Sequence, residues 1–146
     1  MFRKFQAVTT IAMNTTTFYK TEVANAILGA STYSKTGNVY AALHTADPTA
    51  AGNVGELTIG TNAYARVAVT NDGTGFPAAS GGVKSNGAAV TFPAATGSWG
   101  SVTHFSIKDA STGGNTLFYG SLTTAKTVAS GDTISIPAGQ LVLTIS

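Results

Sequence analysis

Cysteine is absent from this 146-residue chain, and charged side chains are scarce. Without cysteine the chain can form no disulfide and offers no thiolate to a metal ion. Charged residues make up 10% of the sequence, against about 25% in typical soluble domains. The exposed surface must therefore consist mostly of Thr, Ser, Asn, Gly and Ala, and such a surface resists association poorly. This scarcity favours a protein that is permanently packed in an assembly over a free enzyme.

Large charge imbalances and long apolar runs are also missing. The net charge of +2 is too small for the electrostatic footprint of a nucleic-acid-binding protein. No apolar run approaches the ~18 residues that a membrane-spanning helix needs. The start, with Arg3 and Lys4, is basic like that of a signal peptide, but Gln6, Thr9 and Thr10 interrupt the apolar stretch that should follow. We therefore expect neither a nucleic-acid partner nor a membrane partner.

Residues 17–29 carry the one helical pattern in the sequence. Their apolar positions recur at spacings of three and four, which gives a helix one apolar face. Thr17 can cap the start of this helix, and Gly29 can end it. The positions that make up the face are Tyr19, Val23, Ala26 and Ile27, widened by Phe18 and Leu28.

From Val39 onward the apolar period changes to two, which is typical of strands. About eight short runs of this kind follow, separated by turns rich in Gly, Asn and Asp, and no βαβ alternation suggests a parallel sheet. We predict a mainly β fold, an antiparallel β-sandwich of jelly-roll type with about eight strands and one short N-terminal helix. The clearest strand places Val102, His104, Ser106 and Lys108 on one face and Thr103, Phe105, Ile107 and Asp109 on the other.

Two turn signals predict β-hairpins. Asn86-Gly87 is a dipeptide that two-residue hairpin turns prefer, and short apolar runs flank it on both sides. Residues 101–121 contain a second candidate, in which the run STGGN turns the chain between two strands. Two short C-terminal strands are expected at Thr133 to Ile136 and in the final run QLVLTIS.

The first thirteen residues are expected to form an arm, and residues 14–146 a single β-sandwich domain with its helix. Free termini fray, so an ordered apolar arm needs a surface to lie on. We expect the arm to dock on a partner through apolar and basic side chains. These are Phe2, Phe5, Val8 and Ile11, together with Arg3 and Lys4.

Residues that could carry chemistry are few and dispersed. His44, Asp47, His104 and Asp109 are the candidate metal ligands, but no two of them have a spacing typical of a metal site. No serine lies in a GxSxG motif, and Asp47, Asp72, Asp109 and Asp132 each lie at or beside a turn, where Asp commonly bonds the backbone. We therefore expect no catalytic residues, no metal and no cofactor. We interpret His44 and Asp47 as the end of a strand and its turn.

Trp99 has two possible roles. An exposed tryptophan could stack against a sugar, whereas a buried one would anchor the core, and we favour the core. The tyrosines lie on different expected strands, which suits core edges or subunit contacts better than a nucleic-acid stacking surface.

Several stretches together resemble a family of small bacteriophage virion proteins that are often described as tail-fibre-like. The resemblance rests on VYAALHTADPTAAGNVGELTIGTNAYARVAVT, which begins at Val39, and on the segment from AAVTFP to the C-terminus. The first stretch carries the YAR strand, and the second carries the WGxVTHF strand and the LFYGSL-T hairpin, in the family's order. The match covers roughly residues 17–146 and leaves residues 1–13 as an extension. The resemblance implies a structural component of a phage particle and no catalysis.

Three functional hypotheses remain open at this point. The first is a capsid decoration (cement) protein that forms a homotrimer, binds the major capsid protein and stabilises the shell through many weak contacts. The second is a fibre, neck or adaptor subunit that binds tail proteins. The third is a carbohydrate-binding module that uses Trp99 or tyrosines to bind a host-surface glycan.

Overall fold

A computed structural model of the chain describes residues 4–8, 11–29 and 31–144. These residues form ten strands, one α-helix, α1 (Thr17–Ile27), and a short 3-10 turn, η1 (Thr61–Ala63). The strands are β1 (Phe5–Ala7), β2 (Ile11–Thr15), β3 (Asn38–His44), β4 (Val67–Thr70), β5 (Val83–Ser85), β6 (Val90–Thr91), β7 (Gly100–Lys108), β8 (Thr116–Val128), β9 (Thr133–Ile136) and β10 (Leu141–Thr144).

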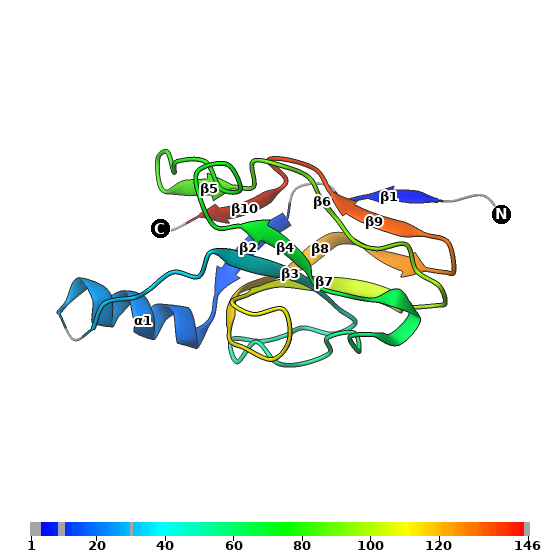
Figure 1. Cartoon of the computed structure of the whole chain (residues 1–146), viewed down its shortest axis with the longest axis horizontal. Coiled ribbons are helices and arrows are strands. Elements are labelled where there is room, and N and C mark those ends of the chain that lie inside the picture. The colour runs from blue at the N-terminus through cyan, green and yellow to red at the C-terminus, as the bar shows by residue number, and fades with distance from the viewer. Residues whose placement is uncertain (1–3, 9–10, 30, 145–146) are drawn as a thin grey trace.

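The strands form two sheets that pack around one apolar core (Figure 1). The larger sheet has the order β4-β3-β7-β8-β2-β10-β5, and the smaller one has the order β1-β9-β6. The long β7–β8 hairpin supplies the centre of the larger sheet, as the sequence pattern predicted. The predicted mainly β sandwich with one short helix is therefore confirmed, with ten described strands in place of about eight.

The N-terminal segment contributes a strand to each sheet. β1 pairs with β9 and β2 pairs with β10, and both pairs are parallel, whereas we expected only antiparallel neighbours. The boundary expected after residue 13 falls inside β2. Sequence alternation did not reveal these strands because each is short and takes its partner from the far end of the chain.

The core lies between the apolar face of β3, β7 and β8 and the smaller sheet. Leu43 and Phe105 are register partners on that face, and Ile134 and Ile136 of β9 belong to the same cluster; all four are fully buried. Val102 is also fully buried in this cluster, although strict alternation predicted that it would share a face with His104. A register shift between Val102 and His104 explains the difference, because a β-bulge changes which side chains face the core.

Asn86-Gly87 does not make the predicted hairpin. The strands on either side of it join different sheets, because β5 pairs with β10 and β6 pairs with β9. The buried Asn86 side chain instead joins three backbone segments: its amide donates to Ala88 O and Pro137 O, and its carbonyl oxygen accepts from Leu141 N. Asparagine therefore serves here as a link between segments rather than as a turn residue.

Helix α1 begins at its predicted place, but its apolar face is covered only near its start. Thr16, one residue before the expected cap, accepts from Tyr19 N at 3.2 Å, and Gly29 follows the helix with a φ of 82°. Phe18 packs against the core, yet none of the helical residues is fully buried. The helix projects from the body of the molecule (Figure 1). Within the described ranges, no helix is long and apolar enough to cross a membrane.

Candidate functional site

His44, at the end of β3, is hydrogen-bonded through both ring nitrogens. Its Nδ1 lies 2.7 Å from Val54 O, and because a carbonyl only accepts, Nδ1 carries the proton. Nε2 therefore accepts from the Ser106 hydroxyl at 2.8 Å. Burial lowers the pKa of His44, so the ring is neutral at pH 7. The pair has the geometry of a nucleophile and its base, but a carbonyl stands where a carboxylate would, and both side chains are closed off from solvent.

Three charged side chains lie close to this pair. Glu56 accepts two hydrogen bonds from Arg66, at 2.6 Å from Nε and 2.8 Å from the second guanidinium nitrogen, and its other neighbour is Lys108 at 3.6 Å. Burial alone would raise the pKa of Glu56, but Arg66 and Lys108 outweigh it and lower that pKa. Burial also lowers the pKa of Lys108, against the attraction of Glu56. The Tyr64 hydroxyl, with a raised pKa because of its burial, accepts from Leu43 N at 2.9 Å.

This polar cluster, which consists of His44, Ser106, Glu56, Arg66 and Lys108, fastens the loop of residues 45–57 onto one face of the larger sheet. Lys108 donates to the loop at Gly52 O, 3.2 Å away, and to Thr116 Oγ1 at 2.7 Å. In the part of the chain that the structure describes, no buried side-chain nitrogen or oxygen lacks a hydrogen-bond partner. The arrangement therefore explains the buried charges as loop anchors, since each buried side-chain nitrogen and oxygen of the described residues already has a partner.

Of the four candidate metal ligands, the structure brings only His44 and His104 together, as register partners on β3 and β7. Asp47 Oδ1 accepts from Thr49 N at 2.8 Å, Asp109 Oδ1 accepts from Asn115 N at 2.7 Å, and His104 bonds to the neighbouring Thr103. The described residues include no group of three or more His, Asp or Glu that could hold a metal ion. Asp72 and Asp132 also accept backbone N–H bonds at turns, so the turn interpretation of all four aspartates is confirmed.

Trp99 is part of the core. It is 6% exposed, its indole N–H donates to Asn62 O at 2.9 Å, and its ring meets Tyr64 edge-on with centroids 5.5 Å apart. A ring buried in this way cannot serve as a stacking platform for a sugar. The core interpretation of Trp99 is confirmed, and this residue gives no support to a glycan-binding role.

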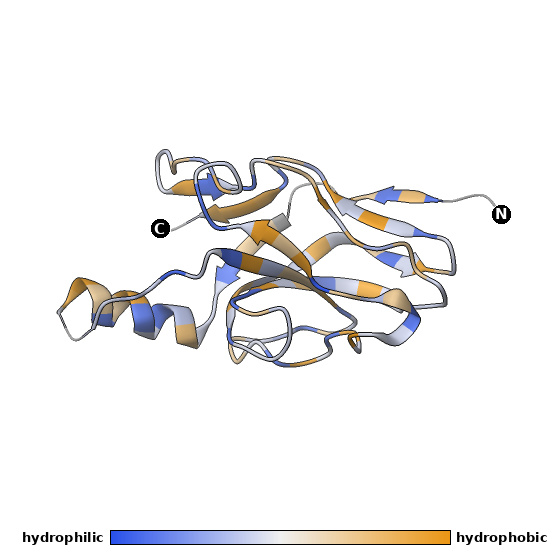
Figure 2. Ribbon diagram, in the orientation of Figure 1, coloured by the Kyte–Doolittle hydropathy of each residue, from blue (hydrophilic) through white to orange (hydrophobic). Residues whose placement is uncertain are grey.

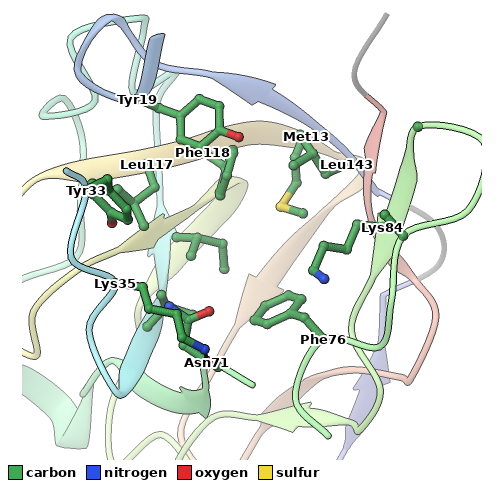
Figure 3. Close-up of a pocket in the computed structure, with 14 residues that line it drawn as sticks. Met13, Tyr19, Tyr33, Lys35, Asn71, Phe76, Lys84, Leu117, Phe118 and Leu143 are labelled. Atoms are coloured by element: carbon green, nitrogen blue, oxygen red, sulfur yellow. Dashed lines mark hydrogen bonds between the residues drawn. The ribbon is translucent and has the colours of Figure 1, made fainter. Parts of the chain in front are cut away.

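A cavity of about 300 Å³ opens over the other face of the larger sheet (Figure 3). Its floor consists of side chains from five strands, namely Met13, Val39, Ile107, Leu117 and Leu143. All of these are at most 7% exposed and belong to the core. The cavity is therefore a part of the sandwich core that neither the smaller sheet nor the helix covers.

The rim of the cavity is polar and carries positive charge. Lys35 and Lys84 lie on it, together with Tyr19, Tyr33 and Asn71. The two ammonium groups donate to backbone carbonyls of Asn71 and Pro77, and within the described ranges neither has a carboxylate within ion-pair distance. Burial raises the pKa of Tyr19 and Tyr33, so both phenols stay neutral at pH 7.

The far end of α1 consists of apolar residues, which Figure 2 colours orange. Ile27 is 74% exposed and Leu28 is 84% exposed. At the other end of the helix Tyr19 packs against Phe118, with ring centroids 4.6 Å apart, which fixes the base of α1 beside the cavity. The uncovered floor of the cavity and the exposed helix end are the two features that the sequence did not predict.

The predicted docking residues have different surroundings. Phe5 on β1 is 65% exposed and Lys4, just before β1, is also exposed, while Val8 is buried in the core of its own chain. Phe2 and Arg3 lie outside the described residues, as does the side chain of Ile11. Only Lys4 and Phe5 of this set are thus seen to face solvent, and the docking role itself stays a prediction.

The residues that sequence reasoning missed are Glu56, Arg66 and the residues that line the cavity. Arg66 interrupts an otherwise apolar alternation beside Tyr64, and a buried charge of this kind signals a partner that the sequence does not identify. The cavity has no such signal, because its lining comes from segments that are far apart in the chain.

Comparison with known proteins agrees with the resemblance seen in the sequence. A family model described as podophage GP4 fiber I protein gp80 matches residues 14–144. No curated protein matches the chain. The match spans every described strand from β3 to β10, the helix and the last two residues of β2. The chain therefore belongs to this Gp80 family of phage virion structural proteins.

Proposed function

We propose that the protein is a non-enzymatic subunit of a fibre-type appendage on a phage particle. The observation that carries this proposal is the family match over residues 14–144, because the family is described as a fibre protein. The polar cluster supports a structural role, since its serine and histidine are sealed beneath the 45–57 loop. The partners are tail proteins and further copies of the same chain, as a homotrimer or another closed ring.

Capsid decoration is the second candidate, and β1 is the feature that favours it. Among the described strands β1 lies at the edge of the smaller sheet, and Phe5 on it and Lys4 just before it are exposed. An unpaired edge with an exposed aromatic side chain is suited to adding a strand from another protein. In a decoration protein this edge would lie on the major capsid protein.

Copy number and position separate the two candidates. We expect electron cryomicroscopy of the particle to place a few dozen copies or fewer at the tail. Hundreds of copies spread over the shell would support capsid decoration instead. Absence of the chain from purified particles would contradict both.

The role of β1 needs its own test, because deletion of the N-terminal segment would remove strands from both sheets. Phe5→Asp keeps the backbone pairing of β1 with β9 and changes only an exposed side chain. We expect this variant to fold normally but to be incorporated into particles less than a tenth as well as the unmodified chain. Val54→Asp, at another exposed apolar position, is the matched control. Equal incorporation of all three proteins would remove β1 from the docking surface.

A further inference from the structure

The distal half of α1 lacks the packing that a short helix needs. α1 has 11 residues, none of them buried. Isolated helices shorter than about 12–15 residues are marginal in water, and helices in proteins draw most of their stability from a packed apolar face. The only described ring contact of α1 is at its base, between Tyr19 and Phe118. Its distal end, with Ile27 and Leu28 exposed, therefore requires a surface that this copy of the chain does not supply.

The cavity, in turn, is an apolar surface that lacks a group to fill it. Its floor is core apolar surface that remains open, and its volume of about 300 Å³ is in the range of cavities that accept apolar groups of several heavy atoms. Exposed apolar patches that have a polar border mark interaction sites. The border here includes Lys35 and Lys84.

The helix end and the cavity rim are also matched in charge. The last turn of α1 has no basic residue, so no charged side chain of that turn offsets the negative end of the helix dipole. The lining of the cavity contains two lysines and no carboxylate. An apolar helix end with a partial negative charge is therefore suited to an apolar cavity with a positive rim.

A helix end cannot reach the cavity of its own chain. Tyr19 lines the cavity, and Leu28 lies nine residues further along α1. At a rise of about 1.5 Å per residue the helix end lies roughly 13 Å beyond Tyr19. In Figure 1 the helix points away from the sheets. The occupant must therefore come from another copy.

We propose that the end of α1, residues Ala26 to Leu28, inserts into the cavity of a second copy of this chain, between Lys35 and Lys84. This contact is heterologous, because the surface that one copy offers differs from the surface that the next copy receives. Repeated around an axis, such a contact closes a ring. The inference deepens the proposed function, on which it rests for the expectation that copies meet, by naming the surfaces through which they meet.

The test uses the full chain and two variants that each remove one half of the contact. The helix-end variant carries Ile27→Asp and Leu28→Asp at exposed positions. The cavity variant carries Ala79→Trp, at an exposed position of the lining from which the indole can fill the opening. Ile59→Asp, at an exposed apolar position outside the cavity lining, is the control. Native mass spectrometry and sedimentation velocity measure association over a range of concentrations.

We expect the unmodified chain and the Ile59→Asp control to associate, and each of the two variants to show at least a tenfold weaker self-association. A mixture of the two variants should give a 1:1 heterodimer that grows no further, because one intact helix end then meets one intact cavity. Lys84→Glu, which leaves the cavity open, should also weaken association. This second variant keeps the test valid if the Ala79→Trp variant does not fold.

Three results would overturn the proposal: an unmodified chain that stays monomeric, a helix-end variant that associates normally, or a variant mixture that forms no heterodimer. The proposed function is tested separately, by locating the chain in phage particles. A chain that associates head to tail but is absent from particles contradicts the function and leaves the contact intact. A chain that is present in particles but associates without α1 contradicts only the contact.

Discussion

The two faces of β3 and β7 are closed in opposite ways. On one face Leu43 and Phe105 are buried by apolar contacts with the smaller sheet. On the other face the polar cluster is buried beneath the 45–57 loop, and each contact there is a directed hydrogen bond or ion pair. One pair of strands therefore supports two kinds of interior, one stabilised by close apolar packing and one by polar pairing. Substitutions on the two faces should therefore change the unfolding free energy, and its dependence on pH, in different ways.

The largest effect is expected from Phe105→Ala on the apolar face. Phe105 is fully buried in the core, so its loss removes buried surface and leaves a cavity. Substitutions of this kind cost about 3–5 kcal/mol of unfolding free energy. Urea unfolding monitored by Trp99 fluorescence measures the loss. A cost below about 1 kcal/mol would mean that this face tolerates a large void, and the contrast between the faces would disappear.

Glu56→Gln on the polar face should have the next largest effect. The exchange preserves shape but leaves Arg66 and Lys108 without their negative partner. Removing one member of a mostly buried ion pair lowers the unfolding free energy by on the order of 3 kcal/mol. This value is the lower end of the usual range, because Glu56 is partly exposed. Glu22→Gln, which removes a carboxylate with no ion pair in the described ranges, is the control for urea unfolding. Equal midpoints for both variants would show that the charged network contributes nothing.

Ser106→Ala tests a single directed bond. The substitution leaves His44 Nε2 as a buried acceptor without its donor. An unsatisfied buried group of this kind costs about 1–3 kcal/mol, although the change removes only one oxygen atom. The unfolding free energy of Ser106→Ala should therefore fall by more than its change in volume explains. Thr91→Ala is the comparison. It removes a hydroxyl that bonds Ser135 at a partly buried position, so it should lower the unfolding free energy less than Ser106→Ala does.

The smallest expected effect is a pH dependence of the unfolding free energy that arises from the polar face alone. The pKa of His44 is lowered on folding from its usual 6.5, so the unfolded chain binds more protons in the window just below pH 6.5. Unfolding free energy must then fall as the pH drops through that window. Unfolding midpoints between pH 8 and pH 5 measure the decline. His44→Gln should flatten it and His104→Gln should retain it; the reverse result would place the titration elsewhere.

Glu56 adds a second step at lower pH. Its pKa is lowered on folding from 4.5, so its contribution to stability is complete above that pH and is lost as the pH falls further. The Phe105→Ala variant should show both steps unchanged, because its defect lies on the apolar face.

The sequence predicted the features that depend on local pattern. Alternation located β3, β7, β9 and β10, and the turn between β7 and β8 followed from its glycines. Local pattern failed where a distant partner decides the outcome. The bulge after Val102 reverses the expected face of that residue, and Asn86 links three segments instead of turning a hairpin.

The candidate site was less accessible to prediction than the fold. The turn aspartates and the core tryptophan could be interpreted from composition and neighbours alone. The apolar positions of α1 were identified correctly, but their periodicity does not say what they contact: Phe18 and Tyr19 pack against their own chain, whereas Ile27 is exposed. The cavity depends on tertiary packing between β2, β3, β7, β8 and β10, which no local signal encodes.

The parallel pairing of β1 with β9 and of β2 with β10 has a consequence for biosynthesis. The first strands to leave the ribosome must wait for the last ones before either sheet can be completed. Contacts between distant segments form slowly, because the long intervening loop must first be closed. A product that ends before β9 therefore leaves β1 without its partner and β2 paired with β8 alone. Only chains that have been translated through β9 and β10 can therefore complete both sheets, and only these would be incorporated into a particle.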